Sequence, residues 1–332
     1  MIHFITFARS YAMVTIVLMH IFMQTSKNDL FQKVISFGGS GVHIFFFLSG
    51  FCLMLGSYTN FQAFYRKRFF KIIVPYWIAV SVLFIAKHLL VPNGAVDSWY
   101  AYFGHIFLYK MFDERIFYSI GYEFWFLSPL LQFYLLFPII RALTDKMKSS
   151  VLIIVSLSFS VIWWVCEIAF GWSSNGPLSE CFIHYLWEFS IGLALARMYK
   201  EKGFLFWNMP ARGAVIMFVV GYLSVIMLSS VQGQVFRTIN DVPLAIGYFG
   251  VLVLVYKVSK KLVKPIHDIM INIGELSYYF YLLHGLVMFI TFYFAMKTGL
   301  PYVKWYAVPL IVFIIYIFSI GYRSILIQLR LA

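Results

Sequence analysis

Charged residues are scarce in this sequence. They make up 12% of its 332 residues, whereas hydrophobic residues make up 62%, and the mean hydropathy is +0.85. A water-soluble domain cannot bury this much apolar surface, so the composition excludes that class of protein. Apolar runs of about twenty residues recur, as membrane-spanning helices require, and they lack the alternation of a β-barrel. We therefore expect an all-α, polytopic integral membrane helical bundle.

Cysteine is also rare, and we find no internal repeat, low-complexity tract or polar terminal segment. The three cysteines (Cys52, Cys166 and Cys181) have no spacing typical of a metal or redox site, and we expect no metal. Cys166 and Cys181 are predicted near one membrane face, where a disulfide or two buried thiols would both fit. Residues 1–332 are therefore expected to form a single transmembrane domain, with no separate soluble domain.

Ten hydrophobic segments are predicted to cross the membrane. Most of the 26 Lys and Arg residues lie in loops on the same side as the N-terminus, which predicts that both termini are cytoplasmic. Their place in short loops also argues against nucleic acid as a partner, despite a net charge of +13. The connection 92–120 is expected to lie in the membrane interface or to dip back into the protein. The predicted spans are 4–24, 38–57, 72–91, 121–140, 151–170, 181–199, 211–229, 243–257, 270–296 and 305–322.

Two ionisable residues, Arg9 and His20, interrupt the first span. They are eleven residues apart, about three helical turns, so they share one helix face and lie roughly 16 Å apart along the axis. An Arg that faces lipid costs about 2.5–3.5 kcal/mol, so such groups normally face the bundle interior or a wet cavity. One interpretation is structural: Arg9 reaches the inner headgroups and His20 bonds a backbone carbonyl. The other makes His20 a general base, because a neutral imidazole accepts a proton near pH 7.

A cluster of cations precedes the third span. We call Arg66, Lys67, Arg68 and Lys71 the basic segment. Its charge density suits a polyanionic cytosolic ligand, such as the phosphates of a nucleotide-bearing cofactor. Positive-inside anchoring and binding of anionic lipid are the alternatives.

Further polar residues are candidates for binding a substrate. Glu123 lies at the predicted outer edge of the fourth span, where it can orient an acceptor or an imidazole, or simply be solvated. Ser49 precedes Gly50 in the second span, a small polar pair that also suits helix packing. Tyr278, Tyr281 and His284 follow each other at intervals of three and form a polar stripe on one helix. His184 and Glu188, four residues apart, can meet on one helix face, as structural groups or as a polar cavity wall.

Five short motifs occur in order along the chain. They are the Arg-x10-His spacing of Arg9 and His20, then GVHIFFFLSGF (41–51), KRFFKIIVPYW (67–77), WFLSPLLQFYLLFP (125–138) and GELSYYFYLLH (274–284). Together with ten predicted spans, they resemble the acyltransferase-3 family of integral membrane O-acyltransferases over nearly the whole chain. The resemblance implies transfer of an acyl group, usually acetyl, from cytosolic acyl-CoA to a sugar hydroxyl of an envelope glycan.

The resemblance also implies roles for particular residues. His20 would be the catalytic His and Arg9 its motif partner, while Arg68 and Lys71, with Arg66 beside them, would bind acyl-CoA. Glu123, Ser49, His284 and Tyr281 are expected to contact the substrate. The chain departs from the family pattern in four places: His43 replaces a usual Asp, Lys71 replaces an Arg, and Leu130 and Leu131 stand where many relatives have Glu.

The resemblance implies a multi-pass, acetyl-CoA-dependent O-acetyltransferase of the bacterial inner membrane. His20 would take the proton of the attacking sugar hydroxyl, and an acyl-His intermediate is a variant of this mechanism. The expected partners are acyl-CoA, membrane lipids and an envelope glycan, free or lipid-linked, with lipopolysaccharide O-antigen first and capsule or exopolysaccharide second. A transporter or flippase for a lipid-linked glycan or acyl group is the alternative class, and a membrane scaffold is a third.

Overall fold

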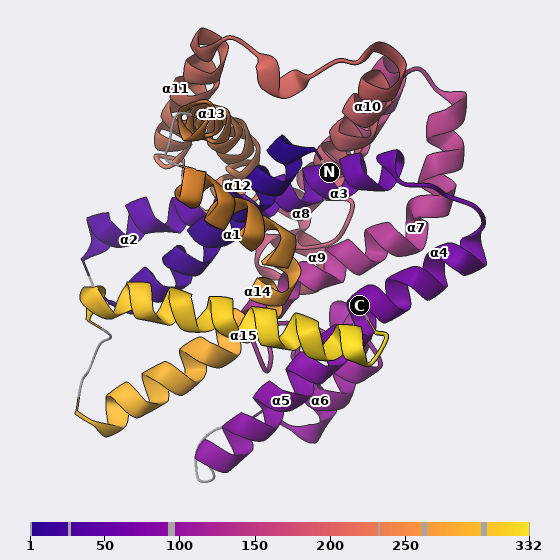
Figure 1. The fold of residues 1–332 in the computed structure, drawn as a ribbon. Helices are drawn as coiled ribbons and strands as arrows, with labels where there is room; N and C mark the ends of the chain where they lie inside the picture. Colours follow the sequence, from indigo (N-terminus) through magenta and orange to yellow (C-terminus); the bar gives the residue numbers. More distant parts are fainter. Residues whose placement is uncertain are drawn as a thin grey trace. The chain divides into compact units, whose positions relative to one another are not determined.

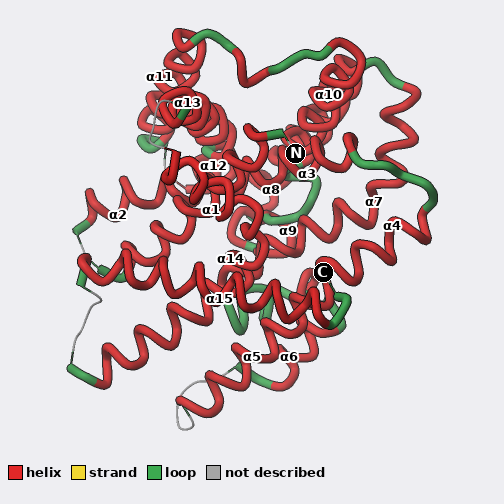
Figure 2. The backbone as a smooth tube through the Cα atoms, in the orientation of Figure 1, coloured by secondary structure: helices red, strands yellow, loops and turns green. Residues whose placement is uncertain are grey.

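The computed structural model describes residues 2–25, 28–91, 97–231, 233–260, 264–299 and 304–331. Within these ranges every regular element is a helix (Figures 1 and 2), which confirms the predicted all-α class. The elements of the first half are α1 (His3–Met23), α2 (Asp29–Ser36), η1 (Phe37–Ser40), α3 (Gly41–Leu55), α4 (Phe61–Arg68), η2 (Phe69–Ile73), α5 (Val74–Leu90), α6 (Trp99–Ile106), η3 (Tyr109–Phe112), η4 (Tyr122–Phe126), α7 (Leu127–Lys146) and α8 (Ser149–Phe170). The second half comprises η5 (Trp172–Ser174), α9 (Gly176–Ser179), α10 (Leu186–Lys202), η6 (Phe206–Asn208), α11 (Ala211–Leu228), α12 (Gly233–Ile239), α13 (Asp241–Ser259), α14 (Lys264–Lys297), η7 (Trp305–Ala307) and α15 (Val308–Gln328).

In the described ranges, nine helical segments are long and apolar enough to cross a membrane. They correspond to nine of the ten predicted spans. The remaining prediction, 181–199, corresponds to α10, whose 17 residues lie at the short end of the range of roughly 17–25 that spans a bilayer. The polytopic membrane fold is therefore confirmed, while the cytoplasmic side of both termini stays a prediction.

The chain divides into two compact units that alternate along the sequence. The first unit contains residues 1–12, 40–59 and 128–274, and the second contains 13–39, 60–127 and 275–332. The division falls within α1 and within α14, so each of these helices contributes to both units. That residues 1–332 act as a single transmembrane domain stays a prediction.

Close helix packing defines the first unit. Helix α10 lies beside α3 and α8, and α11 lies beside α13. At the contact of α3 with α10, a Cβ atom on Gly50 would lie 2.1 Å from the Phe189 carbonyl oxygen, and one on Gly192 would lie 2.1 Å from that of Phe47. Only glycine permits this approach, which confirms the packing interpretation of Gly50. All three cysteines are free thiols, so Cys166 and Cys181 form no disulfide.

A π-turn characterises the second unit. Asn60 begins α4 by accepting a hydrogen bond from the Ala63 N–H, and the helix continues through η2, a π-helical turn, into α5. Pro75 follows the π-turn inside this continuous helix, where its missing N–H removes one backbone hydrogen bond and its ring disturbs the preceding turn. The π-turn contains Lys71 and follows Arg68 directly, so the basic segment lies on helix rather than in a loop.

The connection after α5 packs into the second unit. Its residues 92–96 lie outside the described ranges. Ser98 caps α6 by accepting from the Ala101 N–H. The buried His105 ring joins the Tyr76 hydroxyl on α5, 2.6 Å from Nδ1, to the Ser119 hydroxyl, 3.1 Å from Nε2. His105 and Lys110 of this connection are buried, whereas Trp99, Phe107 and Phe112 are exposed, so both expectations for it stay predictions.

Candidate functional site

A cavity of about 490 Å³ opens within the second unit. Its walls come from the last turns of α1, from η4 and from the second half of α14, and they include His20, Glu123 and His284. This size falls in the range of roughly 300–1,000 Å³ that small-molecule sites occupy. Three predicted site residues from distant parts of the sequence therefore share one cavity.

Two imidazoles form the centre of this site. His20 Nδ1 lies 3.1 Å from His284 Nε2, and the two rings are nearly parallel, with 5.3 Å between their centroids and 5° between their planes. His284 is buried, and its other nitrogen, Nδ1, lies 2.8 Å from the carbonyl oxygen of Tyr281. The partner of His20 is thus a side chain. The interpretation of His20 as a structural residue had predicted a backbone carbonyl in this place.

Glu123 forms another part of the cavity wall. Its Oε1 atom is buried and has no hydrogen-bond partner among the described residues. A Cβ atom on Gly285 would lie 1.6 Å from this oxygen, so the glycine leaves the space that the carboxylate fills. The Tyr281 hydroxyl donates to the Glu123 carbonyl oxygen at 3.1 Å. Glu123 is therefore held in place by its backbone, and its carboxylate can accept a hydrogen bond from a ligand.

Lys110 supports the segment that carries Glu123. Its buried ammonium donates to the carbonyl oxygens of Phe117, at 3.0 Å, and Phe124, at 3.1 Å, and it lies over the Phe117 ring. Burial lowers the pKa of Lys110 to about 7, although the nearby Glu123 carboxylate acts in the opposite direction. Lys110 was not predicted from the sequence, because the residues that neighbour a lysine in sequence do not show that its ammonium is buried.

The predicted polar stripe of α14 connects the cavity to the π-turn. The Tyr278 hydroxyl donates to the Ile72 carbonyl oxygen at 2.6 Å. The ring of Tyr278 lies 6.1 Å from that of Tyr281, whose ring in turn lies 6.3 Å from that of His284. The stripe therefore runs from beside Lys71 to the imidazole pair, entirely within the second unit.

The basic segment presents its cations to the surroundings. Arg66, Lys67 and Lys71 are exposed, whereas Arg68 is half-buried with its guanidinium over the Phe64 ring at 5.4 Å. Exposed cations on consecutive helical turns can bind a multiply charged anion without first breaking buried ion pairs.

Arg9 and Ser49 belong to the first unit. The Arg9 guanidinium donates from Nη2 to Cys52 Sγ at 3.1 Å. Helix α1 runs without interruption through Arg9 and His20, as the spacing argument requires. The structure therefore brings together four predicted site residues (His20, Glu123, Tyr281 and His284) and places Arg9 and Ser49 in the other unit.

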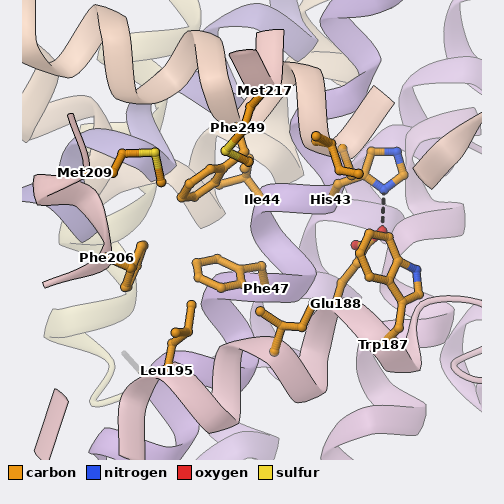
Figure 3. A pocket seen from close by; sticks show the side chains of 13 residues that line it. His43, Ile44, Phe47, Trp187, Glu188, Leu195, Phe206, Met209, Met217 and Phe249 are labelled. Carbon is orange, nitrogen blue, oxygen red and sulfur yellow. Dashed lines mark hydrogen bonds and ion pairs between the residues drawn. The ribbon is translucent and has the colours of Figure 1, made fainter. Parts of the chain in front are cut away.

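A second group of ionisable residues lies in the first unit, with four of them buried and Asp241 25% exposed. Figure 3 shows two of them, His43 and Glu188. His43 Nδ1 lies 2.8 Å from Glu188 Oε1, and His184 Nδ1 lies 2.9 Å from Glu167 Oε1. Asp241 lies between the two rings, 3.4 Å from His184 and 3.9 Å from His43. His184 and Glu188 were predicted to meet on one helix face, but His184 lies in the turn before α10. His184 bonds Glu167 of α8, and Glu188 bonds His43 of α3. We call these five residues the buried ion network.

An apolar cavity of about 240 Å³ borders the buried ion network. His43 and Glu188 stand at its polar end, and Phe47, Phe206 and Phe249 are among its apolar walls (Figure 3). Asp241 was not predicted as a site residue. Its position as an acidic residue at the edge of the predicted span 243–257 could have indicated it. Among the residues that the structure describes, no group of three His, Cys, Asp or Glu side chains is arranged to hold a metal ion.

The comparison with protein families agrees with this architecture. Residues 2–323 match the family model of an acyltransferase domain, so the helical bundle is a multi-pass membrane acyltransferase. The chain belongs to the acyltransferase-3 family, because the match covers nearly its whole length. No match to the chain was found among curated proteins or among solved structures.

Proposed function

We propose that this acyltransferase is an O-acetyltransferase, which moves acetyl from cytosolic acetyl-CoA to a sugar hydroxyl of a cell-envelope glycan. The observation that supports this most directly is the position of His20. Its ring lines a cavity of about 490 Å³ that Glu123 also lines, and its Nδ1 lies 3.1 Å from His284 Nε2. A general base must reach the proton that it abstracts, and a ring buried in side-chain packing could not do so.

The basic segment is proposed to bind the phosphates of coenzyme A. Arg66, Arg68 and Lys71 supply the charge, and Arg68 supplies a planar fork that suits phosphate oxygens. The bond from Tyr278 to the π-turn connects this segment with the helix that carries His284. The pantetheine arm would follow this stripe toward the cavity, while Arg9 holds the donor or adjusts the local electrostatics.

The proposed chemistry is direct acyl transfer. His20 takes the proton of the sugar hydroxyl as its oxygen attacks the thioester carbonyl carbon. A C–O bond forms and the C–S bond breaks, and the His20 imidazolium then returns the proton to the coenzyme A thiolate. The reaction needs no further reactant, because the thioester supplies the activated acyl group.

Glu123 is proposed to orient the acceptor. Its buried Oε1 can accept a hydrogen bond from a second hydroxyl of the sugar, while Ser49 and Tyr281 are further candidates for substrate contact. The acceptor is proposed to be an O-antigen or another surface polysaccharide, free or lipid-linked, and the membrane the bacterial inner membrane.

The test uses purified protein in liposomes with acetyl-CoA labelled in its acetyl group and lipopolysaccharide as acceptor. We expect labelled glycan with the wild type and a loss of about 10²–10⁴-fold with His20→Ala. The control is His267→Gln, which changes a histidine of the first unit that contacts Phe7. Transfer by His20→Ala close to the wild-type rate would refute the proposal, and glycan movement without labelling would favour the transporter.

A further inference from the structure

His284 has a geometry that determines which nitrogen of His20 carries a proton. It stands on α14 beside His20, with 1% of its surface exposed, so nearly all its interactions are with the protein. Its Nε2 faces His20 Nδ1 at 3.1 Å, and its Nδ1 faces the carbonyl oxygens of Tyr281 and Phe280 at 2.8 and 3.2 Å.

The two carbonyls fix the tautomer of His284. A carbonyl oxygen only accepts hydrogen bonds, so Nδ1 of His284 must carry the proton. A neutral imidazole has one N–H, which leaves Nε2 of His284 as an acceptor. The reverse assignment would place a lone pair 2.8 Å from the Tyr281 oxygen in a buried position, and this costs the free energy of an unmade hydrogen bond.

The tautomer of His20 follows from that of His284. Since Nε2 of His284 accepts, Nδ1 of His20 donates, and the proton of a neutral His20 ring resides on Nδ1. The Nε2 atom of His20 is then unprotonated, and this is the form that a general base requires. When that atom takes a proton, the Nδ1–H···Nε2 bond remains and stabilises the imidazolium.

We propose that His284 is a positioning residue that holds His20 in the Nδ1–H tautomer and so keeps Nε2 available as the base. This rests on the proposed function, and it revises the expectation that His284 contacts the substrate. The neutral imidazole takes the place that a buried carboxylate holds in serine hydrolase triads, and it brings no net charge into the membrane.

The first test reads the tautomer without any activity. Protein labelled with ¹⁵N at histidine is reconstituted in nanodiscs, and the ring nitrogens of His20 are assigned by comparison with His20→Asn. We expect the shifts of a protonated Nδ1 and an unprotonated Nε2 at a pH where the ring is neutral. A protonated Nε2 in the wild type would overturn the proposal, whatever the enzyme does.

The second test compares replacements of His284. The amide oxygen of Gln can accept from His20 Nδ1–H, whereas Leu cannot. We expect His284→Leu to lower kcat by about 10²-fold with the KM for acetyl-CoA changed less than about threefold. His284→Gln should recover activity to within about tenfold of the wild type. His267→Gln is the matched control on the same helix.

These outcomes separate the two proposals. Equal losses in the Leu and Gln variants, at normal protein levels and with an unchanged His20 tautomer, would mean that His284 acts otherwise than through His20. An Nδ1–H tautomer together with full transfer by His20→Ala would refute the proposed function and leave the pairing geometry intact.

Discussion

His20 and His284 are 264 positions apart in the sequence, yet their ring nitrogens lie 3.1 Å from each other. The contact joins the second half of α1 to the second half of α14 within the second unit. Because the buried ring is held by backbone carbonyls of its own helix, any movement of α14 is transmitted to the imidazole of α1. The position of the His20 ring is therefore coupled to a helix that begins more than two hundred residues later.

Gly285→Ala should impair catalysis by displacing a carboxylate. The added Cβ would lie 1.6 Å from Glu123 Oε1, so the carboxylate must leave its position. We expect acetyl transfer to fall at least about tenfold, which corresponds to roughly 1.4 kcal/mol of transition-state stabilisation. Gly213→Ala is the control, because a Cβ there has nothing within 4 Å. Labelled-acetyl transfer measures both, and equal rates would exclude a role for the Glu123 position.

Neutralising the basic segment should weaken donor binding more than it slows chemistry. Arg68→Gln and Lys71→Gln each remove one charge-assisted contact, worth about 1.5–3 kcal/mol, so the KM for acetyl-CoA should rise by about tenfold or more. The kcat should change little. Lys33→Gln removes the same charge from the exposed side of α2 and should leave KM unchanged. An unchanged KM in the first two variants would assign the segment to lipid anchoring.

Lys110 predicts a pH dependence of stability. Its pKa is about 7 in the folded protein, against 10.5 for the free side chain. Between these values the unfolded chain binds a proton that the folded chain lacks, so the free energy of unfolding should rise with pH. The rise should be absent from Lys110→Met and present in Lys33→Met. Thermal unfolding in detergent from pH 7 to pH 9.5 measures it, and a slope that Lys110→Met retains would contradict the prediction.

The buried ion network should be fragile to single replacements. Glu188→Ala leaves His43 without its partner at 2.8 Å, and breaking such a pair costs about 3–5 kcal/mol. Replacing both partners, as in His43→Phe with Glu188→Leu, should recover most of this loss, since an apolar pair of similar volume is nearly neutral. Thermal unfolding of the single and double variants measures these changes in stability. A double variant no more stable than Glu188→Ala would show that the pair is not an independent unit.

Much of the fold could be predicted because hydropathy is a local property. Nine predicted spans coincide with long apolar helices, and the tenth corresponds to α10. The spacing of Tyr278, Tyr281 and His284 identified a polar face correctly, because helical periodicity depends only on neighbours. The small residues of α3 likewise indicated close packing, and Gly50 meets α10 as expected.

The site could be predicted only in part, because its contacts join distant segments. Arg9 and His20 were expected to act together, and they lie in different units. His43 was noted only as a departure from a motif, although it bonds Glu188 across 145 positions. The space for the Glu123 carboxylate depends on the absence of a side chain at Gly285. The sequence does not show which group fills the space beside a glycine in an apolar span.

The π-turn at Phe69–Ile73 contains one residue more than an α-helical path would need. Each residue of an α-helix adds a rotation of about 100°. The extra residue therefore fixes the angle about the helix axis between the cations that precede the turn and the buried face of α5. Deleting a single residue there would leave both composition and charge almost intact while swinging Arg66 and Arg68 to another side of the helix. The extra residue in this turn thus determines the direction in which the cations of the basic segment face.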